Sequence, residues 1–194
     1  TVAKFFPDNG NKILLLQGSD YDLSAYIVTI NADDSMTLSD ATLISDRWSG
    51  HFGQYATLLF GNDGGHSFFA ISSRNIDYPT LPPGGSQYSF VTVSLRIGNI
   101  DADEKITVGN SVSIVSSGAD PKAQLTGGLA LNADNTRAIF SRWSCGGIHC
   151  VSTHDSEYQV VSISGITPSL VGGPTKSPTG VDFWMLNSLG TTNK

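Results

Sequence analysis

The stretch YATLLFGNDGGHSFFAISSR (Tyr55–Arg74) contains two β-rich segments that are separated by a polar turn. The first segment is apolar and ends in Asn-Asp-Gly-Gly, and the second begins at His66. Glycine, asparagine and aspartate favour tight turns, so two β-rich segments on either side of such a cluster indicate a hairpin. Amphipathic helical patterns are scarce elsewhere in the chain, and the sequence therefore predicts an all-β protein.

The same hairpin pattern recurs in order along the chain and is followed by further strands. The expected first strands, which are apolar and end in a polar turn, are Val2–Asn11, Tyr55–Gly65, Gly127–Thr136 and Val181–Gly190. The expected second strands are Lys12–Ser19, His66–Arg74 and Thr136–Ser144, and the third are Ala25–Ile30, Tyr88–Leu95 and Tyr158–Ser164. The expected fourth strands, weaker and more polar, are Met36–Ser45, Lys105–Ser117 and Ile166–Gly173. We therefore expect repeat units at about 1–53, 54–124 and 125–178, with a partial unit at 179–194.

Four strands in each unit of about 50 residues is the pattern of a β-propeller blade. Over essentially the whole chain this pattern resembles β-propeller proteins, and the outer strand GITPSLVGG (Gly165–Gly173) is similar to those of repeated propeller domains in virus tail fibres and secreted adhesins. The resemblance implies three four-stranded blades followed by the first strand of a further blade. A β-sandwich or a β-solenoid is the alternative architecture.

The number of units bears on how the chain is organised. Propellers typically have 4–8 blades, so three units do not close a ring. We expect residues 1–194 to form either a single all-β domain of another closed type or a part of a larger propeller, which a longer chain or further copies complete. The unfinished fourth unit would expose a strand edge, which favours strand addition from a neighbour and hence self-association.

The amino-acid composition and charge of the chain indicate which classes of partner we expect. Charged residues make up 14% of the chain, against roughly 25% in typical globular proteins. The polar residues are mainly Ser, Thr, Asn and Gly, a mixture that is typical of extracellular and virion-surface β-proteins. The net charge is −6 and the eleven Lys and Arg residues are scattered singly, so we expect no nucleic-acid partner. No apolar stretch approaches 18 residues, so we expect no transmembrane segment.

Both cysteines lie close together in SCGGIHC, after an expected second strand. Cys145 and Cys150 flank four residues, and a short loop between paired strands brings the flanking residues opposite each other. We therefore expect a disulfide in an oxidising compartment, with two buried thiols as the alternative. Cys145, His149, Cys150 and His154 are zinc-ligand types, but their spacing differs from that of the usual structural sites. We expect no metal there.

Acidic residues recur at expected turns, and the densest group is Asp101, Asp103 and Glu104. Calcium favours clustered oxygen ligands, but no calcium-binding loop of the EF-hand type is present. Turn formation explains these aspartates without a metal. No Gly-x-Gly-x-x-Gly motif follows a strand, so we expect no nucleotide cofactor.

Aromatic and arginine residues supply the candidate binding residues. Two Arg-Trp-Ser triplets contain Arg47 and Trp48, and Arg142 and Trp143. Tryptophan stacks on sugar rings and arginine donates to hydroxyls or carboxylates, which suits a carbohydrate ligand. The alternative is a tryptophan that packs between repeat units beneath its arginine.

The loop Ile76–Gln87 is the other candidate binding segment. It is rich in proline and glycine and is bracketed by Tyr78 and Tyr88. Rigid loops on a β-scaffold commonly bind ligands or partners, and an assembly loop is the alternative.

These patterns predict a binding module rather than an enzyme, because no motif of a catalytic serine or a zinc peptidase occurs. We expect a non-enzymatic extracellular or virion-surface propeller module that recognises a carbohydrate or a protein surface. The first alternative is a structural subunit of an extracellular or virion assembly that uses an open strand edge. The second alternative is a hydrolase or lyase on a propeller, because fold does not fix function.

Overall fold

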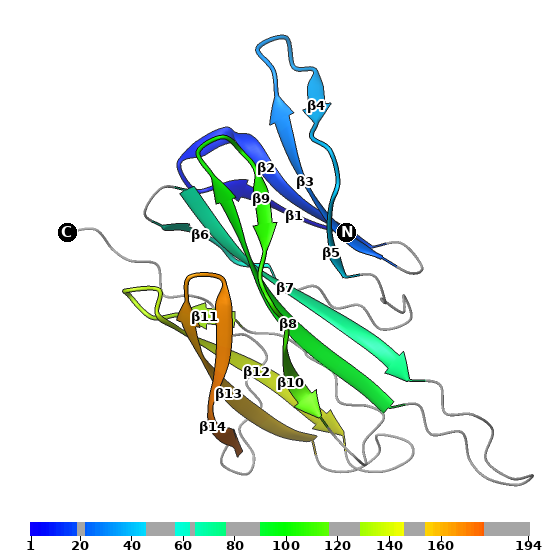
Figure 1. The fold of residues 1–194 in the computed structure, drawn as a ribbon, viewed down its shortest axis with the longest axis vertical. Helices are drawn as coiled ribbons and strands as arrows, with labels where there is room; N and C mark the ends of the chain where they lie inside the picture. The colour runs from blue at the N-terminus through cyan, green and yellow to red at the C-terminus, as the bar shows by residue number, and fades with distance from the viewer. Residues whose placement is uncertain are drawn as a thin grey trace, which may run out of the picture.

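The computed structural model describes residues 1–18, 22–45, 57–62, 65–76, 90–116, 129–145 and 154–176 (Figure 1). Every regular element in these ranges is a β-strand, and the strands form three antiparallel sheets. The prediction of an all-β protein is therefore confirmed. All three sheets are open, and each lies within one of the three full units expected from the sequence.

Sheet 1 contains the first five strands, which follow one another as a meander. They are β1 (Val2–Phe6), β2 (Asn9–Gly18), β3 (Leu23–Ile30), β4 (Met36–Leu38) and β5 (Thr42–Ser45). The order is β1-β2-β3-β4, and β5 also pairs with β3. The expected single outer strand is thus two strands. The break follows from Ser39, whose hydroxyl accepts from the Ile27 amide at 2.9 Å in place of a strand carbonyl.

Sheet 2 repeats this plan. Its strands are β6 (Leu59–Asn62), β7 (Gly65–Ile76), β8 (Phe90–Asp101), β9 (Ile106–Val108) and β10 (Val112–Ser116). The order is β10-β8-β7-β6, and β9 pairs with the end of β8. The outer strand is again divided, here around Gly109, whose amide donates to the Ile97 carbonyl at 2.9 Å.

Sheet 3 has four strands, as expected for one unit. They are β11 (Leu129–Leu131), β12 (Arg137–Cys145), β13 (His154–Ser164) and β14 (Thr167–Lys176), in the order β11-β12-β13-β14. The outer strand β14 is continuous, with an irregularity in its pairing to β13.

The three sheets stack face to face in chain order, with sheet 2 in the middle (Figure 1). The run Phe68–Ile71 in β7 explains why sheet 2 lies in the middle, because its four successive side chains are apolar and alternate between the two faces of the sheet. Phe68 and Ala70 pack against sheet 1, and Phe69 and Ile71 pack against sheet 3. Sheet 2 is therefore buried on both faces.

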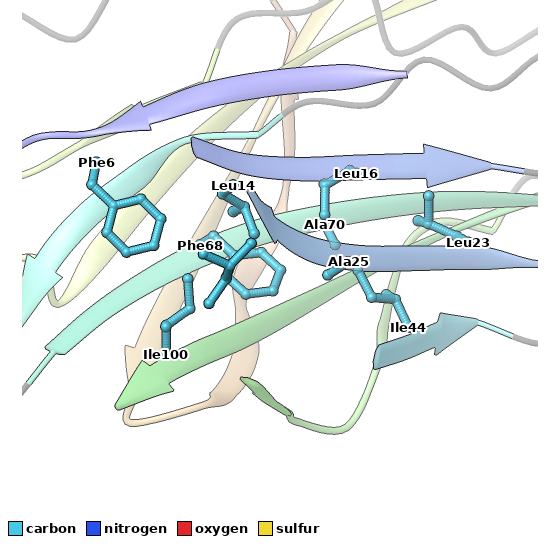
Figure 2. Packing of buried hydrophobic residues seen from close by; sticks show 10 residues of the cluster. Phe6, Leu14, Leu16, Leu23, Ala25, Ile44, Phe68, Ala70 and Ile100 are labelled. Atoms are coloured by element: carbon cyan, nitrogen blue, oxygen red, sulfur yellow. The ribbon is translucent and has the colours of Figure 1, made fainter. Parts of the chain in front are cut away.

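Two hydrophobic clusters fill the interfaces. The cluster between sheets 1 and 2, here the first interface, consists of Phe6, Leu14, Leu16, Leu23, Ala25, Ile27, Ile44, Phe68, Ala70 and Ile100 (Figure 2). The cluster between sheets 2 and 3, here the second interface, consists of Phe69, Ile71, Leu95, Ile97, Ile114, Leu129, Ala138, Phe140 and Val161.

Three hairpin turns in the sheets share one conformation. They span 31–35, 101–105 and 132–136, and the fourth residue of each has a positive φ: 63° at Asp34, 64° at Glu104 and 57° at Asn135. In each turn the amide of this residue donates to the carbonyl of the first residue. Asparagine and the acidic residues tolerate this left-handed backbone better than most residues, which explains why acidic turns recur in the sequence.

Candidate functional site

A groove of about 1020 Å³ lies between sheets 2 and 3. It lies at the end of these sheets where the β8–β9, β11–β12 and β13–β14 turns are found. Its lining residues are Phe60, Gly61, Asn62, Ser67, Asn99, Thr107, Ala133, Asp134, Asn135, Thr136, Ile163, Gly165 and Ile166. We name this hollow the amide groove, because three of its side chains are asparagines.

One wall of the amide groove is a hydrogen-bond network on sheet 2. The Asn62 amide nitrogen donates to the Ser67 hydroxyl and, at 2.8 Å, to the Asn99 side-chain oxygen. Ser67 is buried and lies 3.4 Å from the same Asn99 oxygen. Three neighbouring strands, β6, β7 and β8, supply one residue each, so the register of the sheet fixes the network.

The opposite wall is the turn at 132–136 of sheet 3. Asp134 Oδ1 accepts from the Thr136 hydroxyl at 2.6 Å, from the Thr136 amide at 3.2 Å, and from the Asn132 side chain. These hydrogen bonds, the hydroxyl of Thr136 first, lower the pKa of Asp134 from its usual value of 3.8. The groove therefore presents one carboxylate that is ionised at neutral pH.

The two walls are joined directly at the rim. The Asn135 side-chain nitrogen donates to the Gly61 carbonyl at 3.3 Å, which connects sheet 3 to sheet 2. The groove also has apolar lining residues, among them Phe60, Ile163 and Ile166. The Phe60 ring lies 5.5 Å from the Phe69 ring, which belongs to the second interface. The hydrophobic core thus supports the apolar part of the groove.

This arrangement matches a ligand with many hydroxyl groups and one apolar face. Amide and hydroxyl side chains both donate and accept hydrogen bonds, and Asp134 accepts them. An aromatic ring and two isoleucines offer an apolar surface beside these polar groups. Among the described residues that line the groove, Asp134 is the only one with an ionisable side chain.

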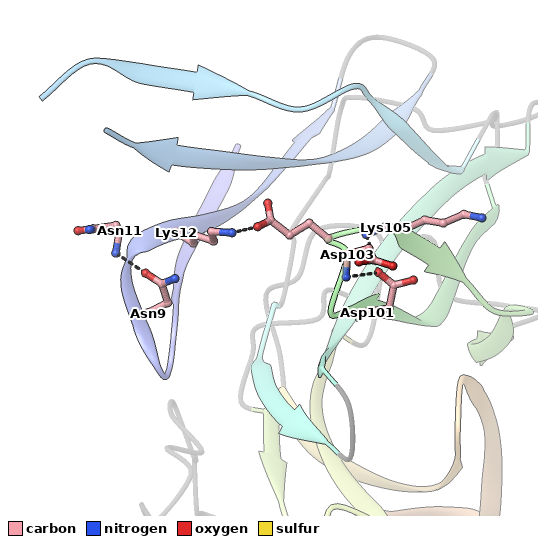
Figure 3. Close-up of polar contacts among 7 residues, drawn as sticks. Asn9, Asn11, Lys12, Asp101, Asp103 and Lys105 are labelled. Carbon is pink, nitrogen blue, oxygen red and sulfur yellow. Dashed lines mark hydrogen bonds and ion pairs between the residues drawn. The ribbon is translucent and has the colours of Figure 1, made fainter. Parts of the chain in front are cut away.

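A second hollow, of about 350 Å³, lies between sheets 1 and 2 and has a different character. His66 Nε2 lies 2.8 Å from Asp8 Oδ1, and Lys12 forms an ion pair with Glu104 (Figure 3 shows the second of these pairs). The Phe6 ring lies 4.7 Å from the His66 ring. Two contacts between side chains, Asp8 with His66 and Lys12 with Glu104, thus cross the first interface at this hollow.

The residues expected to bind a ligand lie elsewhere in the sequence. Arg47, Trp48, Tyr78 and Tyr88 fall outside the described residues. The backbone of Arg142 and Trp143 lies in β12, opposite Glu157 and Ser156 of β13. The side chains of Arg142 and Trp143 lie outside what the structure describes, and their role in binding stays a prediction.

The structure corrects the expected geometry of the cysteine hairpin. Cys145 is the last paired residue of β12, and its partner across the ladder is His154. Cys150 is therefore not the cross-strand partner of Cys145 in this ladder, and residues 146–153 lie outside the described residues. Cys150 and His149 lie outside the described residues, and the described part of the chain contains no disulfide. The disulfide stays a prediction.

The acidic group around Asp101 forms a turn. Asp101 Oδ1 accepts from the amides of Asp103 at 3.0 Å and Lys105 at 2.9 Å (Figure 3). Within the described ranges no group of three or more histidine, cysteine or acidic side chains is placed to hold a metal ion. The hydrogen bonds of Asp101 agree with the interpretation of these residues as turn formers.

Sequence reasoning did not find the residues of the amide groove. Asn62, Asn99 and Asn135 come from two repeat units and from three different strands or turns. The visible signals were two polar turns, NDGG at 62–65 and NADNT at 132–136, which we interpreted as turns alone. The other groove residues resemble ordinary strand and turn residues in the sequence.

Comparisons with protein-family models, with curated proteins and with solved structures found no match for this chain. Among the residues that the structure describes, no helix has the length and apolar character needed to span a membrane.

Proposed function

We propose that this protein is a non-enzymatic, propeller-type binding module of an extracellular or virion surface, and that it recognises a glycan in the amide groove. In this proposal the three stacked sheets are consecutive blades. Their common strand order and face-to-face stacking support that interpretation, and the low charge of the chain supports the location.

The observation that carries the proposal is the lining of the amide groove. Asn62, Asn99 and Asn135 bring amide groups to a hollow that is large enough for several sugar rings. Sugar hydroxyls pair with neutral amides and hydroxyls, and the less polar face of a sugar ring packs on aromatic and aliphatic groups such as Phe60 and Ile166.

The lining also favours binding over hydrolysis. Glycoside hydrolysis commonly requires two carboxyl groups on either side of the bond that is cleaved. Asp134 is the one carboxyl group among the described residues of the groove, and its Oδ1 is engaged by Thr136 and Asn132. We therefore propose recognition without turnover.

A glycan array followed by calorimetric titration of the best glycan tests this function. Thr107 is an exposed groove residue on β9, and Thr107→Trp would fill the groove. The matched control is Thr37→Trp, at the corresponding position of β4 in sheet 1. We expect Thr107→Trp to weaken binding at least about tenfold, which corresponds to about 1.4 kcal/mol, and Thr37→Trp to leave it unchanged.

Two results would contradict the proposal: an array without any bound glycan, or equal affinity of the wild type and Thr107→Trp. Release of cleaved sugar from the bound glycan would favour the hydrolase alternative. Exposed apolar side chains at both ends of the stack support the second candidate function, a structural subunit of an assembly. The Cys145–Cys150 disulfide belongs to this proposal, and mass spectrometry with and without reduction tests it.

A further inference from the structure

The face of sheet 1 that points away from sheet 2 is apolar. Four cross-strand neighbours form a row over β1, β2, β3 and β4: Phe5, Ile13, Val28 and Leu38. Beside this row, Leu15 and Tyr26 are paired on the same face. We name this surface the outer face of sheet 1. Strand pleating places all of these side chains opposite to Leu14 and Leu16, which are buried in the first interface.

The outer face of sheet 1 is exposed over its edges. Phe5 and Leu38 are each 58% exposed, and Leu43 and Met36 are also exposed. The charged residues in the described strands of sheet 1 are Lys4 and Lys12. Lys4 is paired with Leu14 and Lys12 with Thr29, so both belong to the face that points toward sheet 2. An antiparallel sheet with one face in water normally alternates apolar and polar residues, and this sheet does not.

Comparison with sheet 2 indicates what covers such a face. The run Ile13–Leu16 in β2 is apolar at every position, as is the run Phe68–Ile71 in β7. In β7 both faces are buried because a β-sheet packs on each of them. Continuous apolar runs are typical of strands that are covered on both sides. The matching run in β2 therefore indicates a second β-sheet on the outer face of sheet 1.

Sheet 3 lies at the other end of the stack (Figure 1), and its outward face also carries an apolar row. On sheet 3, the residues Ala130, Ile139, Val160 and Val171 form a row across all four strands. This row faces away from Ala138, Phe140 and Val161, which are buried against sheet 2. Ile139 is 40% exposed and Val171 is 41% exposed. We name this surface the outer face of sheet 3.

We propose that the outer face of sheet 1 binds the outer face of sheet 3 of a second copy of this chain. Within the chain, sheet 1 packs on one face of sheet 2 and sheet 3 packs on the other face. A second copy whose sheet 1 packs on the outer face of sheet 3 would continue this stacking in the same direction. Such a head-to-tail contact closes into a ring or extends into a chain of copies. The partner is thus a second copy that supplies a fourth stacked sheet.

Light scattering of the full chain over a range of concentrations tests this proposal. We expect the wild type to form a species larger than 20.5 kDa, the mass of one chain. Phe5→Lys/Leu38→Lys places charge on the outer face of sheet 1, and Ile139→Lys/Val171→Lys places it on that of sheet 3. Each variant is expected to weaken association at least about 30-fold, because a charge in the centre of an apolar interface is unfavourable.

Mixing the two variants distinguishes head-to-tail binding from other modes. Each variant keeps one intact outer face, so an equimolar mixture is expected to form a dimer although neither variant associates alone. Ala32→Lys is the matched control, since Ala32 is exposed and lies in the turn 31–35 and not in a strand of either outer face, and it should associate as the wild type does. Circular dichroism checks that every variant retains its β-structure.

A wild-type chain that remains monomeric at high concentration would overturn the proposal. So would full association of the Ile139→Lys/Val171→Lys variant, because the outer faces of sheet 1 would then bind each other. These measurements use no glycan, and neither double variant changes a residue of the amide groove. Failure of the association and failure of glycan recognition are therefore separate results.

Discussion

The first and second interfaces are both formed by face-to-face stacking of two sheets, but they differ in the polar contacts at the turn end of the sheets. At the first interface, the ends of the sheets are joined by the contact of His66 Nε2 with Asp8 Oδ1 and by the ion pair of Lys12 with Glu104. At the second interface, the corresponding end has a neutral hydrogen bond from Asn135 to the Gly61 carbonyl and a wider groove. In the proposed function, one repeated architecture uses the first interface for cohesion and leaves the second open for a ligand.

The two interfaces also differ in their cores. Phe69 of the second interface forms an aromatic series with Phe60 and Phe140, with ring centroids at 5.5 and 5.6 Å. Phe68 of the first interface packs instead among aliphatic side chains such as Leu14 and Ile100. Because the aromatic series extends to Phe60, a lining residue of the amide groove, the core of the second interface also shapes the candidate binding site.

The largest expected effect comes from removing one aromatic ring on either face of β7. Phe68→Ala and Phe69→Ala delete neighbouring buried rings that point to opposite interfaces, and each is expected to lower the free energy of unfolding by about 3–5 kcal/mol. Urea unfolding measures both. Glycan binding is expected to weaken in Phe69→Ala and to persist in folded Phe68→Ala. A reversal of that order would mean that the amide groove does not depend on the second interface.

A smaller effect is expected at two glycines, one in each interface. A Cβ at Gly98 would overlap the Phe68 ring, and a Cβ at Gly109 would overlap the Ile166 carbonyl of sheet 3. Gly98→Ala and Gly109→Ala are each expected to cost about 1–3 kcal/mol of unfolding free energy. Gly61→Ala is the control, since no atom lies within 4 Å of its added Cβ. If Gly109→Ala were as stable as the control, the close approach of Gly109 to Ile166 between sheets 2 and 3 would be contradicted.

The polar contacts of the two interfaces are expected to differ in how strongly their contribution to stability depends on salt concentration. Lys12→Gln removes an ion pair of the first interface and is expected to cost about 0–1 kcal/mol at low ionic strength and less in 1 M salt. Asn135→Gly removes the neutral hydrogen bond of the second interface and retains the positive φ at this position. It is expected to cost about 0.5–1.5 kcal/mol, with little dependence on salt. Equal salt dependence of the two variants would contradict the proposed difference between an ion pair at the first interface and a neutral hydrogen bond at the second.

The smallest effect concerns the pH dependence of two turns. The Ser35 hydroxyl and amide lower the pKa of Asp33, as those of Thr136 do for Asp134, from a usual value of 3.8. The stabilisation that these hydrogen bonds provide is therefore present above pH 3.8 and is lost as the pH falls through the lowered pKa. Titration of the carboxyl signals by NMR is expected to show that Thr136→Val raises the pKa of Asp134 and leaves that of Asp33 unchanged. No change at Asp134 would contradict the assigned cause.

The sequence was sufficient to predict the all-β class of the fold. Turn residues such as those at 31–35 and 101–105 are local signals, because an αL backbone position selects asparagine or an acidic residue whatever the rest of the fold does. The outer strand of sheet 1 was less predictable. Its interruption depends on a hydrogen bond between Ser39 and Ile27, which are twelve residues apart in the sequence.

The candidate site was largely invisible in the sequence. Asn62 meets Asn99 across β7, and Asn135 reaches Gly61 from another sheet, so these contacts arise only when strand register and sheet stacking are both fixed. The strand partner of Cys145 could not be read from the sequence for a related reason. The pairing of Cys145 with His154 is set by the whole β12–β13 ladder and not by the few residues between the two cysteines.

The central claim is that sheet 2 lies between sheets 1 and 3 and is covered on both faces. Hydrogen exchange of the backbone amides tests it directly, under conditions in which the chain is monomeric. The account predicts the slowest exchange in the middle of β7 and β8, around Phe69 and Leu95, and faster exchange in β2, β3, β12 and β13. Slowest exchange in sheet 1 or sheet 3, with rapid exchange in β7 and β8, would contradict it.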